Sequence, residues 1–330
     1  MGQLLIVHFH GEEANAESLK LLQEAHVGGF ILYGWSNGLT SVEQVKRLTA
    51  TLQKSNPSYL PLWIGVDQEG GRVSRLSQLF PRPPSEKTSY ENRNVYQDTL
   101  AMARQLKEVG INLNFAPVVD VNSNPENPII GDRAYSASPQ EVVKAGSEAL
   151  KAYREMDILC TLKHFPGHGD TKSDSHHALP TVSKSLAELN VCELLPFKEL
   201  QKEAPFIMTA HLLVPAIDPD SPITFSKKAL KELLKEQWGF QGVVISDSLV
   251  MKALKPFAPT HEEAALQALL AGCDVLCLGG KLLQEASQDE LTTNDILRIH
   301  RYLVEAVKKG IYPESQLNDS ISRIQKIKAL

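Results

Sequence analysis

The sequence lacks the features of proteins that work on membranes or on nucleic acids. No apolar run approaches the roughly 20 residues that span a bilayer. Positive charge is not in excess, since 34 Lys and Arg stand against 39 Asp and Glu, for a formal net charge of -5. Binding to nucleic acid or to an anionic membrane needs a basic face. We therefore expect neither as a partner.

Cysteine is scarce, and the first apolar run has no basic segment before it. We therefore expect no export signal at the N-terminus, and Ile6 stands where a myristoylation signal has Ser or Thr. The cysteines lie in or beside apolar runs without metal-type pairing, which is typical of reduced thiols in the cytosol: Cys160, Cys192, Cys273 and Cys277. The expected location is the cytoplasm.

Linkers rich in Pro, Gly or Ser are also missing, so a single domain over residues 1–330 is expected. The chain instead alternates short apolar runs with segments of helical spacing. The eight runs are residues 4–9, 29–33, 62–66, 111–119, 158–162, 206–208, 243–245 and 275–278. This alternation predicts a (β/α)8 barrel. An open doubly wound sheet fits less well, because no run leads into a glycine-rich phosphate-binding turn.

The predicted helices between the runs are residues 18–25, 42–52, 96–109, 139–155, 186–200, 227–237 and 261–271. Candidate N-caps are Ser41, Ser138 and Ser226, and candidate glycine stops are Gly110, Gly239 and Gly272. Two further helices within residues 292–330 are expected to cover the barrel.

Charged and polar side chains follow the carboxyl ends of the runs far more often than the opposite ends. Active sites of barrel enzymes lie at the carboxyl ends of the strands. This asymmetry therefore predicts a catalytic site there. The densest stretch, residues 163–177, contains four histidines and two aspartates directly after a buried run.

Two groups in these segments suit catalysis. Asp247 follows the seventh run, and a carboxylate there, kept ionised by Lys163 or Arg133, suits attack on an acetal carbon; the alternative role is a helix cap. Asp174 and His176 are one residue apart, so in an extended segment they share a face and form a carboxylate-imidazole pair for proton transfer. His177 then faces away. The alternative is a surface loop without a catalytic role.

Four residues are candidate ligands for hydroxyl and carbonyl groups: Asp67, Arg75, Arg133 and Lys163. Short carboxylates bind vicinal diols through two contacts, and Arg and Lys donate to sugar oxygens. Taken singly, each is also typical of a salt-bridge partner at a strand end.

The stretch KHFPGHGDT at residues 163–171, followed by Asp174-Ser175-His176, resembles the signature of glycoside hydrolase family 3 in its NagZ-type single-domain β-N-acetylglucosaminidase branch. Further similar stretches are DQEGGRV at 67–73, NFAPVVDV at 114–121, GDR at 131–133, MTAH at 208–211 and SD at 246–247. The resemblance covers most of the chain.

The resemblance implies a (β/α)8 barrel that removes terminal β-linked N-acetylglucosamine with retention of configuration, without a metal or other cofactor. Asp247 would be the nucleophile and His176 the acid/base, with Asp174 as its partner. The sugar would be bound by Asp67, Arg75, Arg133, Lys163 and His164. The implied substrate is N-acetylglucosamine linked to 1,6-anhydro-N-acetylmuramic acid, with or without peptide, in peptidoglycan recycling.

Two positions depart from the family pattern. Ser248 follows the nucleophile where many relatives have a second acidic residue, which alters the hydrogen bonding around Asp247. After the second run, relatives often show Arg-Asn, whereas this chain has Gly34-Trp35-Ser36-Asn37. The outer part of the pocket is therefore expected to differ.

Three alternatives stay open. His8 and His10 mimic the HxH ligands of a metal-dependent amidohydrolase barrel, with Lys163, His211 and Asp247 further on, although the Lys and the last Asp fall on the wrong strands. The second alternative is a catalytically silent sugar-binding protein. The third is phosphorolysis of the same bond, since a His acid/base repels phosphate less than a carboxylate does. His8, His10, His168 and His177 have no assigned role, and the oligomeric state is not predicted.

Overall fold

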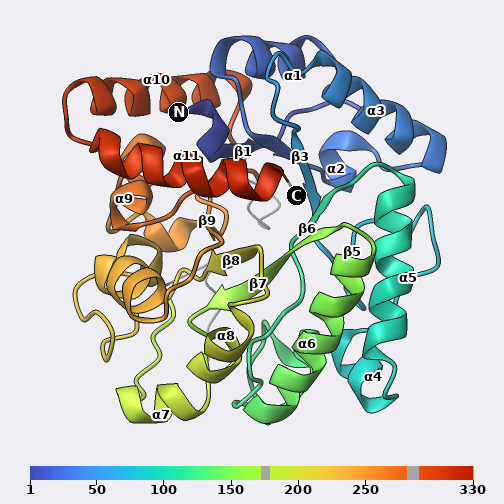
Figure 1. Ribbon diagram of the computed structural model, residues 1–330, viewed down its shortest axis with the longest axis vertical. Helices are drawn as coiled ribbons and strands as arrows, with labels where there is room; N and C mark the ends of the chain where they lie inside the picture. Colours follow the sequence, from blue (N-terminus) through green and yellow to red (C-terminus); the bar gives the residue numbers. More distant parts are fainter. Residues whose placement is uncertain (172–178, 281–289, 330) are drawn as a thin grey trace.

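The computed structural model describes residues 1–171, 179–280 and 290–329, and its centre is a barrel of eight parallel strands (Figure 1). Each strand includes residues from one of the eight predicted apolar runs. They are β1 (Leu5–Val7), β2 (Gly29–Ile31), β3 (Trp63–Val66), β6 (Leu113–Asn114), β7 (Leu159–Phe165), β8 (Phe206–Thr209), β9 (Val243–Ser246) and β10 (Leu276–Leu278). The barrel prediction is therefore confirmed.

The strands pair in the order β10-β1-β2-β3-β6-β7-β8-β9, and a parallel bridge between Ile245 and Val275 joins the two ends. In the register, Ile6 lies opposite Gly29 on one side and Cys277 on the other. Nearly every strand residue is buried. Such strands are covered on both faces, which is why the sequence shows continuous apolar runs rather than an alternating pattern.

Helices cover the outside of the barrel, and most match the predicted segments. They are α1 (Ala16–Lys20) with its π-helical continuation η2 (Leu21–Ala25), α3 (Val42–Ser55), α5 (Val95–Glu108), α6 (Pro139–Glu155), α7 (Leu186–Val191), α8 (Leu194–Leu200), the π-helix η5 (Lys228–Gln237) and α9 (His261–Ala271). The single helix predicted over 186–200 is wrong, because the chain breaks at Cys192. Pro196 explains the break, since a proline clashes with the carbonyl four residues before it and cannot donate to it.

The predicted helix ends are confirmed with one exception. The Ser41 hydroxyl accepts the N–H of Gln44 at 3.2 Å, and the Ser226 hydroxyl accepts that of Ala229 at 3.1 Å. Ser138 forms no side-chain cap, and Pro139 begins α6 instead. Proline has no N–H that needs a hydrogen-bond acceptor, and its fixed φ suits the first helical position. The start of α6 therefore depends less on a side-chain cap.

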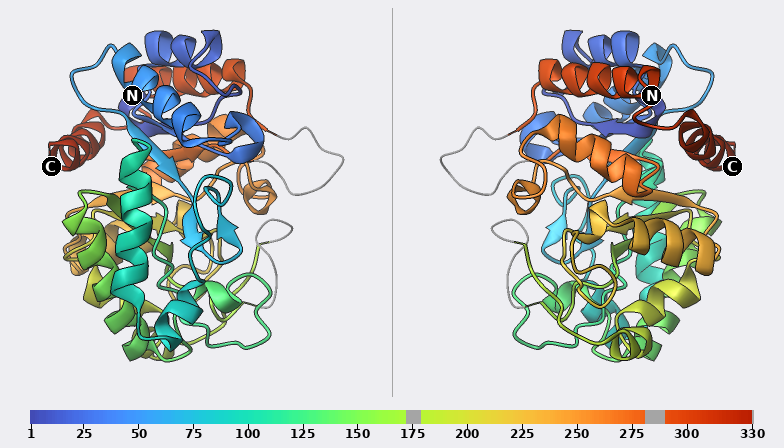
Figure 2. Two further views of the ribbon diagram at one scale, coloured as in Figure 1. Left: turned by 90° about the vertical axis from the view of Figure 1, so that its right-hand side faces the viewer. Right: turned by 90° about the vertical axis from the view of Figure 1, so that its left-hand side faces the viewer.

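The last two helices, α10 (Thr293–Lys308) and α11 (Glu314–Lys328), cover the barrel as expected. α11 lies across the amino-terminal ends of the strands, at the end of the molecule where Figure 2 shows both termini. Lys328 Nζ donates to the Gly28 carbonyl at 2.8 Å, and Arg323 donates to the Gly242 carbonyl at 2.9 Å. This helix therefore closes the end of the barrel opposite the candidate site.

Several small elements were not predicted. A hairpin of β4 (Gln68–Gly70) and β5 (Val73–Ser74) follows β3, and its turn uses positive φ at Gly70 and Gly71. The short helices α2 (Gly34–Asn37) and α4 (Glu86–Glu91) lie in segments without periodic spacing. Elements of two to six residues are too short for apolar periodicity to reveal them.

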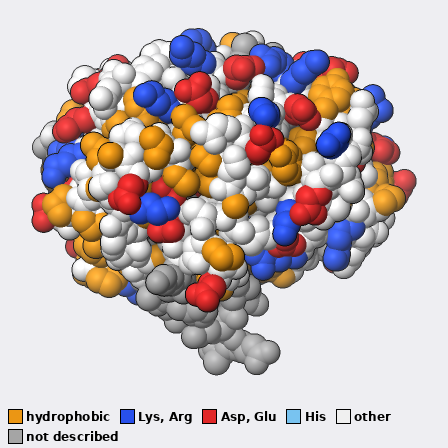
Figure 3. Space-filling view, turned by 90° about the horizontal axis from the view of Figure 1, so that it is seen from below, with side chains coloured by type: hydrophobic (Ala, Val, Ile, Leu, Met, Phe, Trp, Pro, Cys, Tyr) orange, Lys and Arg blue, Asp and Glu red, His pale blue; other side chains and the backbone are white. Residues whose placement is uncertain are grey.

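Side chains of both charge signs occur together on the surface. On the face seen in Figure 3, basic and acidic side chains are interspersed with apolar ones. Among the residues that the structure describes, no helix has both the length and the apolar character needed to cross a membrane.

Candidate active site

The candidate residues converge because the barrel strands are parallel and end on the same side. Asp67 follows β3 directly, Lys163 and His164 lie in the last part of β7, and Asp247 follows β9. Arg133 comes from the short 3-10 helix η3 (Gly131–Arg133) in the loop after β6. Side chains from separate parts of the chain thus surround one end of the barrel, where barrel enzymes have their active sites.

Glu69 in β4 is the centre of a buried ion network. Arg133 donates two parallel hydrogen bonds to it, from Nε to Oε2 at 2.7 Å and from Nη2 to Oε1 at 2.9 Å. Lys163 Nζ lies 2.6 Å from Glu69 Oε1 and 3.0 Å from Asp67 Oδ1. Two cations and two anions are therefore fixed relative to one another, and the two-pronged contact adds orientation as well as energy.

The network stays charged although it is buried. Burial alone would raise the pKa of Glu69, but Arg133 and Lys163 outweigh it and hold this pKa well below its usual range. Burial alone would lower the pKa of Lys163, but Glu69 and Asp67 outweigh that effect and raise it. A buried charge is tolerated when it is paired in this way.

His164 is held by Asp120, which is fully buried. His164 Nδ1 donates to Asp120 Oδ2 at 2.7 Å, so its Nε2 carries the lone pair that faces Arg133 Nη2 at 3.3 Å. Asp120 Oδ1 also accepts the backbone N–H groups of His164 and His168, at 3.1 and 2.7 Å. Burial opposes ionisation of Asp120, but His164 and then His168 outweigh it and lower the pKa of this carboxyl.

Asp247 is half-buried at the end of β9, and the backbone that follows it is pinned. Asp247 Oδ1 accepts the N–H of Ser248 at 2.7 Å. The Ser248 hydroxyl donates to the Gly279 carbonyl at 2.6 Å, and the Ser248 carbonyl accepts from His211 Nε2 at 2.9 Å. Ser248, the departure from the family pattern, therefore ties the end of β9 to the end of β10.

Asp67 and Asp247 each follow a strand of the parallel barrel directly, so both lie at its carboxyl end. Burial raises the pKa of Tyr33 and that of Cys277, and in both cases the charges of Asp67 and Asp247 raise it further. Tyr33 follows β2 and Cys277 belongs to β10, so both carboxylates affect the pKa of two groups on separate strands. The two carboxylates therefore border one mouth of the barrel.

The two cations expected to keep Asp247 ionised pair directly with other carboxylates. Among the described residues, Lys163 pairs with Asp67 and Glu69, and Arg133 pairs with Glu69, rather than with Asp247. In the barrel, β8 lies between β7, which holds Lys163, and β9, which precedes Asp247. The β4-β5 hairpin places Glu69 within ion-pair distance of both Lys163 and Arg133.

The remaining candidates divide into three cases. Arg75 is exposed just after β5, outside the buried network, and its charge reaches Tyr33. Asp174, His176 and His177 lie outside the described residues. His168 is buried, its Nδ1 hydrogen-bonds with the Thr171 hydroxyl at 2.9 Å, and burial lowers its pKa to about 4. His168 thus stabilises the loop segment from His168 to Thr171.

Two carboxylates near this end of the barrel, Glu69 and Asp120, were given no role in the sequence analysis. The spacing of Glu69 from Asp67 was a usable signal, because in an extended segment residues two apart share a face. Asp120 had a weaker one, its place at the end of a strand. Its bonds to the backbone around His164 depend on the path of a loop that no local pattern predicts.

Comparison with known proteins agrees with this geometry. The model of the glycosyl hydrolase family 3 N terminal domain matches residues 1–327. Beta-hexosaminidase A of Pseudoalteromonas piscicida is 36% identical over 94% of this chain, which spans 55% of that protein. The beta-hexosaminidase of Idiomarina loihiensis is 38% identical, over 84% of this chain and 83% of its own length.

A solved structure has the same fold over nearly the whole chain. The family 3 beta-N-acetylglucosaminidase of Paenibacillus sp. str. FPU-7 superposes with a TM-score of 0.91 at 36% identity, covering 99% of this chain and 61% of that one. The chain thus spans little more than half of some relatives. The amidohydrolase alternative is wrong, because the family differs and Lys163, its bridging ligand, is engaged by two carboxylates. The chain belongs to glycosyl hydrolase family 3, the family of the beta-hexosaminidases that it matches.

Proposed function

We propose that this chain is an exo-acting β-N-acetylglucosaminidase that cleaves with retention through a covalent glycosyl-Asp247 intermediate. The observation that carries the proposal is that Asp247 lies at the same end of the barrel as a fixed set of sugar-binding candidates. The names of its relatives, beta-hexosaminidase and beta-N-acetylglucosaminidase, support the same sugar.

In this proposal the accessible edge of the ion network binds the sugar. The side chains of Asp67 and Arg133 are 19% and 13% exposed, whereas those of Glu69 and Lys163 are 1% and 3% exposed. Asp67 and Arg133 are therefore the groups that meet hydroxyl or carbonyl oxygens, and the buried pair holds them in position. Such preorganised groups cost little reorganisation when the substrate binds.

The two chemical steps follow from the assigned roles. The Asp247 carboxylate attacks the anomeric carbon, and the glycosidic oxygen leaves with a proton from His176. A water molecule then gives a proton to His176 and attacks the same carbon, which releases Asp247 and the β-configured sugar. Asp174 orients His176 and stabilises its charged form. These last two roles rest on the resemblance and on the spacing.

The finer substrate assignment is part of the proposal. We infer that the natural leaving group is 1,6-anhydro-N-acetylmuramic acid, with or without peptide, and that residues 1–330 act as one catalytic unit in the cytoplasm during peptidoglycan recycling. The motif at residues 163–176 supports this inference.

Product analysis tests the proposed activity. The enzyme is given an aryl β-N-acetylglucosaminide and the matching aryl β-glucoside side by side, and the first-formed anomer is followed by NMR. We expect cleavage of the N-acetylglucosaminide, with the β-anomer appearing first. Preference for the glucoside would contradict the sugar assignment, and an α-anomer would contradict the covalent intermediate.

A further inference from the structure

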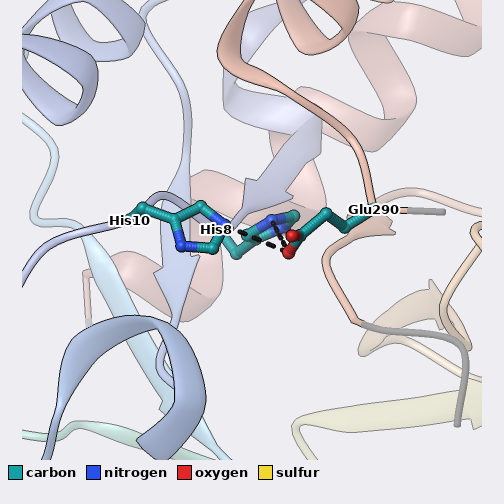
Figure 4. Close-up of side chains that lie close together, drawn as sticks. All are labelled: His8, His10 and Glu290. Atoms are coloured by element: carbon teal, nitrogen blue, oxygen red, sulfur yellow. Dashed lines mark hydrogen bonds and ion pairs between the residues drawn. The ribbon is translucent and has the colours of Figure 1, made fainter. Parts of the chain in front are cut away.

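His8 and His10 follow β1 at the active end of the barrel, and both point toward Glu290 (Figure 4). Glu290 lies shortly before α10, so it comes from the opposite end of the chain. His10 Nε2 is 3.0 Å from Glu290 Oε2, and His8 Nε2 is 3.9 Å from the same oxygen. The three potential ligand atoms all lie within 4.8 Å of one another.

The buried histidine presents an unsatisfied lone pair. The side chain of His8 is completely buried, and its Nδ1 donates to the Leu278 carbonyl at 3.4 Å. Its Nε2 has no hydrogen-bond partner among the residues that the structure describes. With the hydrogen on Nδ1, Nε2 is an acceptor that faces a carboxylate oxygen, which is also an acceptor. A cation between them satisfies both.

We propose that His8, His10 and Glu290 bind a zinc ion. Two imidazoles and one carboxylate are a ligand set that zinc accepts, whereas magnesium and calcium prefer oxygen ligands alone. Tetrahedral zinc with ligands at about 2.1 Å places ligand atoms about 3.4 Å apart, and the distances of 3.0 and 3.9 Å bracket this value. The carbonyl that orients His8 is the outer partner that zinc-bound histidines usually have.

This site is separate from the groups that touch the sugar. None of its three ligands belongs to the network of Glu69, Arg133 and Lys163, and the site ties the end of β1 to the segment that leads into α10. It also differs from the amidohydrolase arrangement, which needs Lys163, His211 and Asp247 as further ligands.

The ring of Trp35 provides a reporter for zinc. Its centroid lies 5.6 Å from that of His8 and 5.5 Å from that of His10. Fixing both imidazoles on an ion changes the surroundings of this half-exposed indole. Zinc should therefore change tryptophan fluorescence in the wild-type protein, and the Trp35→Phe variant should lose that change while it still binds zinc.

The test uses the full chain after exhaustive dialysis against a chelator. ZnCl2 is titrated by calorimetry, with MgCl2 as the comparison. We expect one tight zinc equivalent, no comparable magnesium binding, and a higher midpoint of thermal unfolding with zinc. His10→Ala and Glu290→Gln should each weaken zinc binding by more than about 100-fold, the upper end of the cost of losing an outer partner. His26→Asn and Glu13→Gln, both exposed, are the matched controls.

The histidines of the 163–177 stretch are the competing zinc ligands, so the titration is repeated with His176→Ala and His177→Ala. If the proposal holds, both variants retain the tight equivalent. Zinc binding that survives His10→Ala and Glu290→Gln but is lost with His176→Ala overturns the proposal. Failure of the metal-free wild-type protein to bind zinc overturns it as well.

Discussion

Arg133 and Glu69 are 64 residues apart in the sequence and form a two-pronged ion pair at 2.7 and 2.9 Å, almost entirely removed from water. Lys163 shares the same carboxylate. In the proposed sugar site, this buried carboxylate therefore lies behind the more accessible Asp67 and Arg133. Its effect on binding is exerted through the position of its partners.

The first prediction concerns stability. Glu69→Gln keeps the shape of the side chain but leaves Arg133 and Lys163 buried without their shared anion. Removing one partner of a buried ion pair costs about 3–5 kcal/mol, so we expect the free energy of unfolding in urea to fall by about that amount. Glu305→Gln, which removes an exposed partner of Lys308, should have little effect. Equal stability of the two variants would contradict the buried network.

The second prediction concerns the nucleophile. Asp247→Ala should fold normally and lose cleavage of an aryl β-N-acetylglucosaminide by at least about 10³-fold, as other enzymes do without their nucleophile. Added azide should restore turnover by occupying the space of the lost carboxylate, and should give the glycosyl azide of α configuration. Asp220→Ala, at an exposed aspartate, is the control. Near-normal turnover of Asp247→Ala would show that the assignment is wrong.

The third prediction separates the acid/base from its neighbour. Loss of a general acid typically costs about 10²–10⁴-fold, and the loss is greatest when the leaving group needs a proton. His176→Ala should therefore lower kcat/KM strongly for a disaccharide and much less for a nitrophenyl glycoside. His177→Ala should leave the ratio of kcat/KM for the two substrates unchanged. A uniform loss across leaving groups in His176→Ala would argue against proton donation by this residue.

The fourth prediction follows from the pKa of His168, which burial lowers from 6.5 to about 4. Between these pH values the unfolded chain binds the proton more tightly, so the unfolding free energy rises with pH. Acidification from pH 6.5 to pH 4 should therefore remove about 3 kcal/mol of stability through this group. His168→Gln should flatten the profile in this window, whereas the exposed control His26→Asn should not. An unchanged slope in His168→Gln would contradict the pKa.

The fifth prediction addresses the acceptor. If water is the acceptor, added inorganic phosphate leaves both the rate and the product, free N-acetylglucosamine, unchanged. Chromatography of the products with and without phosphate measures this directly. Accumulation of N-acetylglucosamine 1-phosphate would favour the phosphorolytic alternative while leaving the nucleophile assignment in place.

The sequence predicted the barrel well because its strands are buried on both faces and so appear as eight apolar runs. It was less successful with elements too short for a period, such as β4, β5 and α4. The placement of Asp67, Lys163, Arg133 and His164 near one another follows from strand ends meeting at one edge. The pairings themselves did not follow, because Glu69 reaches Arg133 through the path of two loops, which local spacing does not determine.

β1, the first strand of the chain, pairs with β10, the last, through Leu5 opposite Leu276, and α11 reaches Gly28 beside it. The barrel therefore cannot close until β10 has left the ribosome. Until then the edges of β1 and β9 are open to pairing with other chains. A chain that ends before β10 should consequently aggregate rather than fold as a smaller barrel, although it still contains Asp247 and the residues of the ion network.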